Sequence, residues 1–600
     1  MSLSCSLLPD FYPGDDVLQF DLRLAIPTST YFEDGRGQCY CLQGYSCDTE
    51  WISRRRISGS LACADATSIQ QDINNHDNKN SMRYMWLDRL YAFILPPVTK
   101  WDAARFLTLS VDPWARYPSI QTLKEDIIAG EDQQTCNNNE DISCEVPSTN
   151  HNQDDDGRYF ASSEQAHAFL PFLPIAIRYT ANFLLDSVPS SILPSTYEAT
   201  AALSAIIINM FAFVIASISL YDLTLFTLKK DALEKKYNAT KKDIPVEIIE
   251  QHDASIHTLA TTAAQLFCFN PAGVFFTTAY SESIFAMLTF GGHAIAARGQ
   301  YYQCYMQKTR LTGVSCWLWA NLYWIPSTIL WMLASFTRSN GTFSSIWWLL
   351  IGIAKCCSYI QASKGKGNTI IVCKVVSLLL VHVALASLVA MPVLYHDWQG
   401  YIYHCTSSQL TPSSTITPTW CNKYERFSLY AHVQRKHWNV GFLKYYEMKQ
   451  IPNFILALPV LVLSFTAAAL WIRHSWNRYM NNGVTCLKEA LLWAFLALGA
   501  SSSDLKSTGR SKVSLQLLGP KFLSYYAILA GFAIVGAFLA HVQISTRLIC
   551  SSCPAFYWFV SSLTIDDGSR DKRVGMLLYF YFALYNILGI IMHVNWLPWT

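Results

Sequence analysis

The chain has 600 residues, of which 51% are hydrophobic and 15% are charged, and its formal net charge at pH 7 is +2. Long apolar stretches along most of the sequence argue against several soluble domains. The net charge does not indicate a partner, and no basic patch suggests nucleic-acid binding, so no nucleic-acid partner is expected. Aromatic residues make up 14% of the chain, a content typical of a membrane bundle with aromatic belts at its interfaces.

The N-terminal part of the chain is polar. Residues 1–83 are weakly patterned, and residues 1–100 contain neither a run of about 18 apolar residues nor a signal peptide. Residues 84–166 carry many aromatic side chains and are predicted to form one extended loop before the membrane body. Within this loop, residues 124–158 are acidic and Asn-rich, and they are predicted to be a disordered insert because they hold too little apolar surface to fold alone.

Residues 167–600 are predicted to form a multi-pass membrane body of about eight to ten spans, since one span needs roughly 20 mostly apolar residues. The clear candidate spans are Ala199–Leu228, His257–Ala297, Ser315–Phe336, Val372–Leu394, Pro452–Trp471, Phe522–Val542 and Gly575–Trp596. Weaker candidates, which are short or interrupted, are His167–Leu185, Phe343–Ile360, Cys486–Ala500 and Cys553–Leu563. The expected fold class is therefore an all-α polytopic membrane protein.

The segments between spans differ in charge, which predicts their side of the membrane. The linker Lys229–Lys242 is the densest in lysine, and the positive-inside rule places it in the cytosol, together with the basic connector Ser501–Lys521. Residues 395–436 are rich in Ser, Thr and Pro, so we expect a luminal loop that continues to about residue 451. Asn238 begins a glycosylation sequon in the first linker, so a glycan on it would show on which side of the membrane this linker lies.

The cysteines allow two readings. Many of the 18 lie in apolar stretches, where a thiol acts as a small hydrophobic group. Two pairs, Cys136/Cys144 and Cys405/Cys421, lie in polar loops and would be disulfides if those loops are luminal. Spacing alone does not establish pairing, so the bonded and the free states both stay open.

An acid follows an aromatic residue at Trp101-Asp102, inside the segment WDAARF. A carboxylate there could accept a proton from an attacking hydroxyl, and such general-base catalysis contributes about 10²–10⁴-fold. The alternative is a helix start, with Asp102 as the cap and Arg105 as its partner. The dipeptide alone favours the helix start.

A second acid and a histidine lie three residues apart at Glu164 and His167, ahead of Pro171 and Pro174. On one helix face they could form a carboxylate–imidazole pair that contacts a phosphate or a sugar. A plain surface helix start is the simpler reading. The spacing also occurs in metal sites, but no second matching motif is present, so we expect no metal or other cofactor.

Several ionisable and amide residues lie at the ends of spans. Glu282, Arg338 and Arg547 stand out because a charge at membrane depth costs about 2.5–3.5 kcal/mol and usually faces a cavity or a partner. Arg547 follows His541 and Gln543 and is a candidate phosphate ligand. Snorkelling of these side chains to the interface is the alternative.

Residues 438–454 combine rings, amides and lysines immediately before a span. The residues that suit a lipid-linked glycan are Trp438, Asn439, Lys444, Gln450 and Asn453. Rings would stack on sugars and amides would bind hydroxyls, whereas an aromatic anchor at the membrane interface is the alternative.

This segment, WNVGFLKYYEMKQIPNF, closely resembles the signature region of the second mannosyltransferase family of glycosylphosphatidylinositol (GPI) anchor synthesis. Further matching motifs follow the family order: WDAARF at Trp101, EQAHAFLPFLP at Glu164, NPAGVFFTTAYSESIFAMLTF from Asn270, RSNG at Arg338 with Asn340, HVQISTR at His541, YWF at Tyr557, and HVNWLPWT from His593. The resemblance covers most of residues 85–600.

The resemblance implies a bundle similar to type C glycosyltransferases, with luminal loops in the endoplasmic reticulum (ER) and residues 84–166 as the catalytic loop. It implies dolichyl-phosphate mannose as donor and mannosylated glucosaminyl-phosphatidylinositol as acceptor, with inverting transfer of the second, α1,6-linked mannose. Asp102 becomes the expected catalytic base, while Arg338, Arg547 and His167 become candidates for the phosphate. The expected substrate-binding residues are Trp101, Glu164, His167, Arg338, Asn340, Trp438, Asn439, Lys444, Gln450, Asn453, His541, Gln543 and Arg547.

The alternatives are another mannosyltransferase that uses lipid-linked sugars, or a polytopic transporter or scramblase, although no repeated halves are visible. Membrane lipid is an expected partner, and the sequence leaves an accessory membrane subunit open. The chain departs from the family pattern before Trp101, where polar sequence around Asp16–Asp34 occupies the place of a first span.

Overall fold

The computed structural model describes the greater part of the chain. The described residues are 32–33, 39–40, 90–91, 93–111, 164–189, 191–194, 196–239, 246–309, 313–362, 368–406, 419–422, 428–481, 522–565 and 572–597. The predicted insert, the Cys136/Cys144 pair, the weak span Cys486–Ala500 and the connector Ser501–Lys521 lie outside them, as do most of residues 1–83 and much of the loop 395–436.

The described residues are almost entirely helical, which confirms the expected all-α polytopic class. The long helices are α7 (Phe172–Ser187), α8 (Tyr197–Ala239), α9 (Val246–Cys268), α11 (Glu282–Thr309), α13 (Trp324–Thr337), α14 (Ser344–Ala362), α15 (Asn368–Tyr401), α17 (Ile451–Asn481), α20 (Leu523–Ile534), α22 (Pro554–Thr564) and α23 (Lys572–Val594). Shorter ones are α4 (Asp102–Val111), α10 (Gly273–Thr277), α12 (Val314–Leu322), α16 (Leu429–Trp438) and α21 (Ser545–Ser552). Two two-residue strands, β1 (Phe32–Glu33) and β2 (Cys39–Tyr40), pair antiparallel.

Single-turn elements complete the described chain. They are the 3₁₀ helices η2 (Glu164–Ala168), η3 (Ser339–Phe343), η6 (Thr419–Asn422), η8 (Met448–Gln450) and η11 (Val542–Ile544), and the π-helices η4 (Ile402–Thr406) and η10 (Val535–Leu539). Several of these turns adjoin the residues that the sequence singles out as site candidates.

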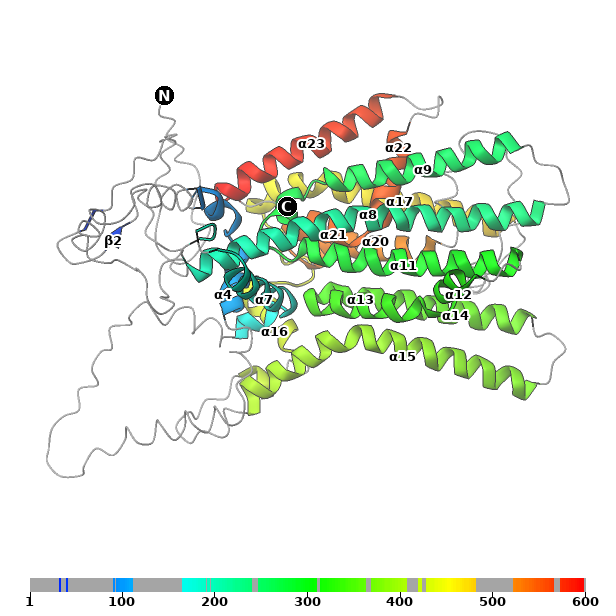
Figure 1. Cartoon of the computed structure of the whole chain (residues 1–600), viewed down its shortest axis with the longest axis horizontal. Helices are drawn as coiled ribbons and strands as arrows, with labels where there is room; N and C mark the ends of the chain where they lie inside the picture. Colours follow the sequence, from blue (N-terminus) through cyan, green and yellow to red (C-terminus); the bar gives the residue numbers. More distant parts are fainter. Residues whose placement is uncertain are drawn as a thin grey trace.

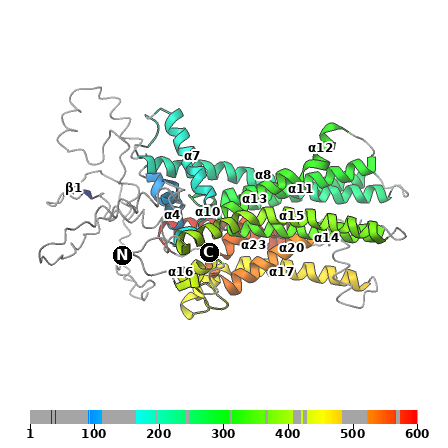
Figure 2. The ribbon, with the colours of Figure 1, turned by 90° about the horizontal axis from the view of Figure 1, so that it is seen from below.

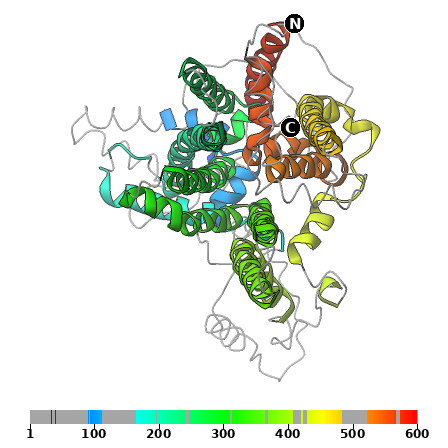
Figure 3. The ribbon, with the colours of Figure 1, turned by 90° about the vertical axis from the view of Figure 1, so that its right-hand side faces the viewer.

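Four of the described helical segments are long and apolar enough to cross a membrane. They are Tyr197–Lys230, Ile371–Cys405, Met448–Ser475 and Lys572–Val594. Many of their large apolar side chains are exposed, as on α15 and α23, which is the pattern expected where lipid and not water surrounds a helix. Figure 1 shows these helices, which belong to α8, α15, α17 and α23, extending along the length of the bundle, and Figure 3 views the bundle from one end.

Three predicted spans are not continuous helices. The stretch His257–Ala297 divides into α9 and α11, with Pro271 and the short α10 between them. Proline cannot donate a backbone hydrogen bond, and Asn586 of α23 instead binds the carbonyl oxygens of Phe269 and Asn270. The prediction of one span there is therefore wrong, and the break places Glu282 at the start of a helix.

The other two interrupted spans also divide into more than one helical element. The stretch Ser315–Phe336 is divided at Tyr323 into α12 and α13. The stretch Phe522–Val542 passes into the π-helix η10 and ends at Ala540. Conversely, the first part of the basic segment Lys229–Lys242 is no linker, because α8 continues to Ala239.

Small side chains allow the two central helices to approach closely. The alanines of α8 and α11 that are buried in the core include Ala201, Ala205, Ala212, Ala216, Ala286 and Ala297. Close packing of small residues is the usual basis of helix association in membranes, since lipid tails are as apolar as the side chains themselves. This pair forms a rigid frame on which the neighbouring helices pack.

The helix ends that carry the candidate residues gather at one end of the bundle. Figure 1 shows α4, α7, α16, the start of α8 and the end of α15 on the left, whereas the basic C-terminal end of α8 lies at the opposite end. Figure 2 gives the same arrangement from below, with α17 on the other side of the bundle from α7 and α8.

Candidate active site

A buried carboxylate organises two of the predicted arginines. Glu282 is the first residue of α11 and its side chain is fully buried. Its Oε1 lies 2.6 Å from Nη1 of Arg338 and 2.7 Å from Nη2 of Arg547. These residues come from the start of α11, the position directly after α13 and the first turn of α21, so a single carboxylate joins three helices. A buried charge persists only when paired, and two cations around one anion leave a net positive charge at this point.

Asp102 lies beside this group. Its Oδ2 is 3.7 Å from Nη1 of Arg547, and the Tyr280 hydroxyl accepts a hydrogen bond from the Asp102 backbone N–H at 3.2 Å. The preceding residue, Trp101, has a φ of 60°, a left-handed conformation that turns the chain sharply into α4. The structure thus brings three of the predicted residues, Asp102, Arg338 and Arg547, into one cluster.

The segment before Asp102 is fixed to the C-terminal end of α23. Lys100 donates a hydrogen bond of 2.6 Å to the carbonyl oxygen of Val594, and Trp101 donates one of 3.4 Å to that of His593. Trp101 also packs against Trp596 with ring centroids 5.2 Å apart. These contacts hold Asp102 in place at the start of α4.

The surroundings of Asp102 make its carboxylate a stronger base than that of an ordinary aspartate. Although 47% of its side chain is accessible, burial by surrounding protein atoms raises its pKa, and this effect outweighs the opposing charge of Arg547. A position in the first turn of α4 also suits an acid, because the helix dipole favours negative charge there. Asp102 can therefore start α4 and also act as a base.

The nitrogens of the Arg547 guanidinium face two different carboxylates. Its Nε and Nη2 both bind Glu282, whereas Nη1 points to Asp102. The guanidinium lies over the rings of Phe275 at 4.3 Å and Tyr280 at 4.8 Å. Such stacking keeps the planar group in one orientation, so that Nη1 can bind an anion next to Asp102.

The RSNG motif forms the turn between α13 and α14. Arg338 donates a hydrogen bond of 3.2 Å to Ser281, and Asn340 donates one of 3.0 Å to Ser552 at the end of α21. A Cβ atom at Gly341 would lie 2.5 Å from the backbone nitrogen of Ser335, so only glycine fits this close approach. Asn340 therefore serves to join two of the helices that carry the arginines.

The segment 438–453 lies against the end of η10. The Gly441 and Leu443 N–H groups donate to the carbonyl oxygens of Leu539 and Phe538 at 3.0 and 2.8 Å. Asn439 ends α16 with a φ of 46°. Lys444 is exposed on this segment.

His541 connects this segment with the chain that leads to Arg547. The Tyr445 ring packs on His541 with centroids 4.4 Å apart, and Asn453 donates to the Tyr445 hydroxyl at 3.1 Å and to Gln450 at 2.7 Å. His541 also hydrogen-bonds the backbone of Trp438, and burial lowers its pKa. Gln543 is half-buried in η11, between His541 and Arg547.

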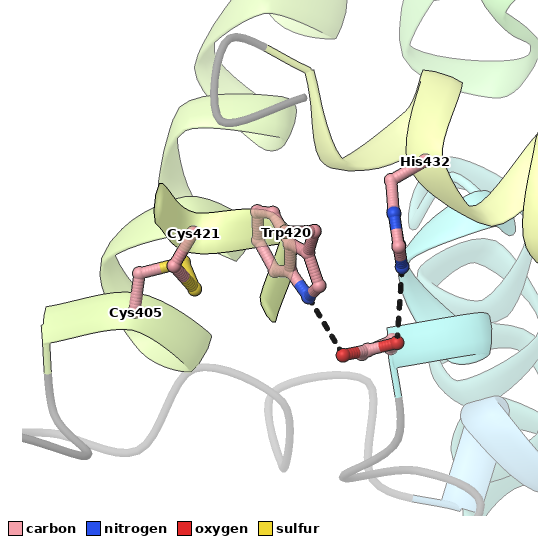
Figure 4. Close-up of a disulfide and its surroundings, with 5 residues drawn as sticks. Cys405, Trp420, Cys421 and His432 are labelled. Carbon is pink, nitrogen blue, oxygen red and sulfur yellow. Dashed lines mark hydrogen bonds and ion pairs between the residues drawn. A yellow bond between two sulfur atoms is a disulfide. The ribbon is translucent and has the colours of Figure 1, made fainter. Parts of the chain in front are cut away.

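Glu164 and His167 belong to a second cluster. Glu164 accepts hydrogen bonds of 2.7 Å from Trp420 and 2.9 Å from Lys436, and His432 lies 3.6 Å away. Figure 4 labels Trp420 and His432 and draws their contacts with this carboxylate as dashed lines. Burial acts to raise the pKa of Glu164, but the hydrogen bonds from Lys436 and Trp420 outweigh it, so the pKa lies below its usual range.

His167 contacts different residues from the same turn. Its ring is buried, with Nδ1 3.4 Å from Nε2 of His404, and its carbonyl oxygen lies 2.8 Å from Nε2 of His396. The described contacts of Glu164 and His167 thus point to α15 and α16, and the structure does not bring either residue together with Asp102 by a described contact.

A disulfide closes this second cluster. Cys405 and Cys421 are bonded, with an S–S distance of 2.02 Å, which confirms one of the two pairs that the sequence left open. Cys421 follows Trp420 directly, so the bond holds the Trp420 indole beside Glu164, as Figure 4 shows.

Sequence reasoning singled out Glu282 as a membrane-depth charge but gave it no place among the site residues. It missed Tyr280 altogether, although both lie in the sequence YSES at the start of α11. Among the residues that the structure describes, no three His, Cys, Asp or Glu side chains come together as a metal site.

The chain matches the family model described as Mannosyltransferase (PIG-V) over residues 244–600, more than half of its length. The chain belongs to this family. The match contains Glu282, Arg338, segment 438–453 and Arg547, and it begins after Asp102. The enzyme is accordingly a mannosyltransferase.

Named relatives match more than half of the chain. The Cricetulus griseus protein named GPI alpha-1,6-mannosyltransferase 2 is 30% identical over 391 residues, which cover 56% of this chain and 70% of the relative. The Drosophila pseudoobscura pseudoobscura protein named GPI mannosyltransferase 2 is 25% identical over 476 residues, or 74% of this chain and 85% of the relative. The Schizosaccharomyces pombe protein of that name is 25% identical over 333 residues, 55% of this chain and 54% of the relative. No solved structure matches.

Proposed function

We propose that the enzyme transfers the second, α1,6-linked mannose of the GPI anchor from dolichyl-phosphate mannose to mannosylated glucosaminyl-phosphatidylinositol in the ER lumen. The names of the relatives support the product of this reaction. The single observation that supports the chemistry is the 3.7 Å approach of Arg547 to Asp102, because it sets a base beside a cation at one point.

In the proposed step, a hydroxyl of the acceptor attacks the anomeric carbon of the donor mannose. The hydroxyl proton passes to a carboxylate oxygen of Asp102 as the new glycosidic bond forms. The bond between the anomeric carbon and the phosphate oxygen breaks, and dolichyl phosphate leaves with the electron pair. One displacement inverts the β-linked donor to an α-linked product.

The leaving phosphate gains negative charge, and Arg547 is the residue that we assign to it. Its Nη1 lies next to Asp102, and Glu282 with the rings of Phe275 and Tyr280 holds the guanidinium in position before the substrate arrives. A preorganised cation stabilises charge that develops in the transition state without reorganising at that moment. Arg338 adds a second positive charge through the same Glu282.

The proposed sidedness rests on two observations. The lysine-rich end of α8 lies at the opposite end of the bundle from α4 (Figure 1), so a cytosolic lysine segment puts Asp102 on the luminal side. The Cys405–Cys421 disulfide lies at the same end as α4, and disulfides persist in the oxidising ER lumen.

Complementation tests this function in living cells. Cells that lack the second mannosyl transfer to the GPI anchor should regain surface display of an anchored reporter when the wild-type chain is expressed. Arg547→Gln should not restore display, because the phosphate loses its cation. Arg473→Gln, which removes an exposed arginine of α17, is the matched control and should restore it.

Two results would contradict the proposal. Failure of the wild-type chain in these cells, with rescue of cells that lack another lipid-linked mannosyl transfer, would assign the enzyme to a different acceptor. Full rescue by Arg547→Gln would agree with the acceptor that we propose, but it would contradict the role of Arg547 at the leaving phosphate.

A further inference from the structure

A cavity of about 280 Å³ lies between three helices, away from Asp102. Its walls come from α8, α11 and α13, and they include Ile215, Ser219, Met287, Gly291 and Leu330. Arg298, at one end of the cavity, follows Glu282 by 16 residues on α11, which corresponds to about 24 Å along the helix axis. The charged end of the cavity is therefore far from the proposed catalytic cluster, whereas its Met287 end lies five residues, about 7.5 Å along the helix axis, from Glu282.

The walls of the cavity are mostly apolar and face the outside of the bundle. Ile215 and Ile218 of α8 are 46% and 58% exposed, and both lie in the candidate membrane span Tyr197–Lys230. The cavity thus opens sideways, in the direction in which a hydrocarbon chain lies in a membrane. Its volume is slightly below the roughly 300 Å³ of small ligand pockets, enough for a chain segment but not for a whole lipid.

One end of the cavity is charged. Arg298 donates a hydrogen bond of 2.5 Å from Nη2 to Oδ2 of Asp222, and both side chains remain about one-third exposed, at 32% and 29%. The guanidinium lies between the rings of Phe226 at 4.7 Å and Trp319 at 5.2 Å. The described bond uses one nitrogen of Arg298 and one oxygen of Asp222, so both charges have further capacity to bind a ligand.

This charged end lies at the level where the apolar part of the bundle stops. Lys230 donates a hydrogen bond of 3.2 Å to Gln300, which joins α8 and α11 eight residues beyond Asp222 on α8 and two residues beyond Arg298 on α11. Tyr301 and Tyr302 pack on Phe226, with ring centroids 5.6 and 6.4 Å away. Tyrosines beside lysines are characteristic of the boundary between hydrocarbon and headgroups.

We propose that this cavity is a binding site for a phospholipid with an ethanolamine headgroup. One acyl chain enters the cavity along Ile215 and Met287. The phosphate binds Arg298 and the ammonium binds Asp222. The headgroup part of the site, at Arg298 and Asp222, is about 24 Å along α11 from Glu282, so the proposal is independent of the mannosyl transfer proposed above.

The paired charges select the headgroup. A phosphoethanolamine group carries one negative and one positive charge, which match Arg298 and Asp222 in number and sign. An anionic headgroup, such as glycerol or inositol phosphate, would have its phosphate beside the Asp222 carboxylate without a cation to offset it. A choline headgroup carries no N–H, so it cannot donate a hydrogen bond to that carboxylate.

Native mass spectrometry of the purified enzyme can count the lipids that remain bound. The probes are phosphatidylethanolamine, phosphatidylcholine, phosphatidylglycerol and phosphatidylinositol with identical acyl chains. Wild-type enzyme should retain one phosphatidylethanolamine about tenfold more tightly than the others, a difference near 1.4 kcal/mol. Asp222→Asn and Arg298→Gln should remove this preference.

A substitution in the apolar part tests the cavity itself. Gly291 lines the cavity, and a Cβ atom there would meet only Leu330 at 3.4 Å and Ser219 at 3.7 Å, so Gly291→Leu fills the space without displacing backbone. It should reduce retention of phosphatidylethanolamine about tenfold. Gly531→Leu is the matched control, because Gly531 on α20 has nothing within 4 Å and lies outside the cavity.

Three results would overturn the proposal. One is equal retention of the four lipids by the wild-type enzyme, which identifies them as non-specific boundary lipids. Another is undiminished retention of phosphatidylethanolamine in Gly291→Leu. The third is preferential binding of phosphatidylinositol, which would contradict the headgroup assignment.

Discussion

The carboxylate of Glu282 holds Arg338 and Arg547 together, and its loss would leave Arg338 without its ion-pair partner and Arg547 with only Asp102, at 3.7 Å. We expect Glu282→Gln to destabilise the folded enzyme by about 3–5 kcal/mol, the range typical for breaking a buried ion pair. Thermal unfolding in detergent measures the change.

A double-mutant cycle separates this pairing from a general defect. In Glu282→Gln/Arg547→Gln one of the two cations is also removed, so the double variant should be less destabilised than the sum of the two single variants. Strict additivity would show that Glu282 and Arg547 do not act as a pair.

The pH dependence of transfer should report Asp102. Burial raises the pKa of its carboxyl, and a general base acts only when deprotonated, so activity should fall with falling pH at a value above about 3.9, the ordinary value for aspartate. Because Arg547 lowers that pKa, Arg547→Gln should move the acid limb of kcat/KM to higher pH. Arg473→Gln should leave the limb in place, and an unmoved limb in both variants would exclude Asp102 as the titrating group.

Single residues also show how far the sequence could predict the site. Asp102, Arg338 and Arg547 were recognisable because each charge is adjacent to an apolar stretch and within a family-like motif. Tyr280 was not, because a tyrosine in an apolar run is usually core, and only the fold brings its hydroxyl to the Asp102 backbone. Glu164 and His167 matched a motif equally well, yet their contacts lie with the disulfide cluster.

Among the elements, the turn η6 depends on its disulfide. The Cys405–Cys421 bond joins residues 16 positions apart, and a loop of that size contributes about 3 kcal/mol in the chain-entropy description. Cys421→Ser should lower the stability of the enzyme by about this amount. Cys373→Ser, which removes an exposed free cysteine of α15, is the control and should have little effect.

Loss of the bond should also free the Trp420 indole from Glu164. Tryptophan fluorescence should therefore change in Cys421→Ser and not in Cys373→Ser. An unchanged stability together with unchanged fluorescence would show that the other contacts of η6 hold it without the bond.

Hydropathy predicted where apolar helices occur but not where they break. The interruption at Pro271 lies in a stretch that contains few charged residues, and the break is stabilised by Asn586, more than 300 residues away in the sequence. Windowed hydropathy averages over such a turn. The local sequence pattern does not predict the distant contact with Asn586, although Pro271 itself indicates that a helix can break there.

At the scale of the whole molecule, the sidedness of the bundle is open to a direct test. Asn238 lies at the end of α8 that we place in the cytosol, so it should carry no glycan although its sequon is intact. Gln409→Asn creates a sequon with Thr411 in the loop that we place in the lumen, and it should be glycosylated. Endoglycosidase-sensitive mobility shifts in microsomes measure both, and the opposite pattern would invert the topology.

The central claim is that Asp102 is the base of the transfer reaction. The most direct measurement is the rate of mannose transfer from dolichyl-phosphate mannose in microsomes that contain Asp102→Asn, compared with Asp186→Asn, an exposed aspartate of α7. Asparagine keeps the size of the side chain but cannot accept the proton. We expect Asp102→Asn to lose about 10²-fold or more in rate at an unchanged protein level, and Asp186→Asn to match the wild type. Transfer at the wild-type rate by Asp102→Asn would contradict the claim and leave Asp102 as a helix-starting residue.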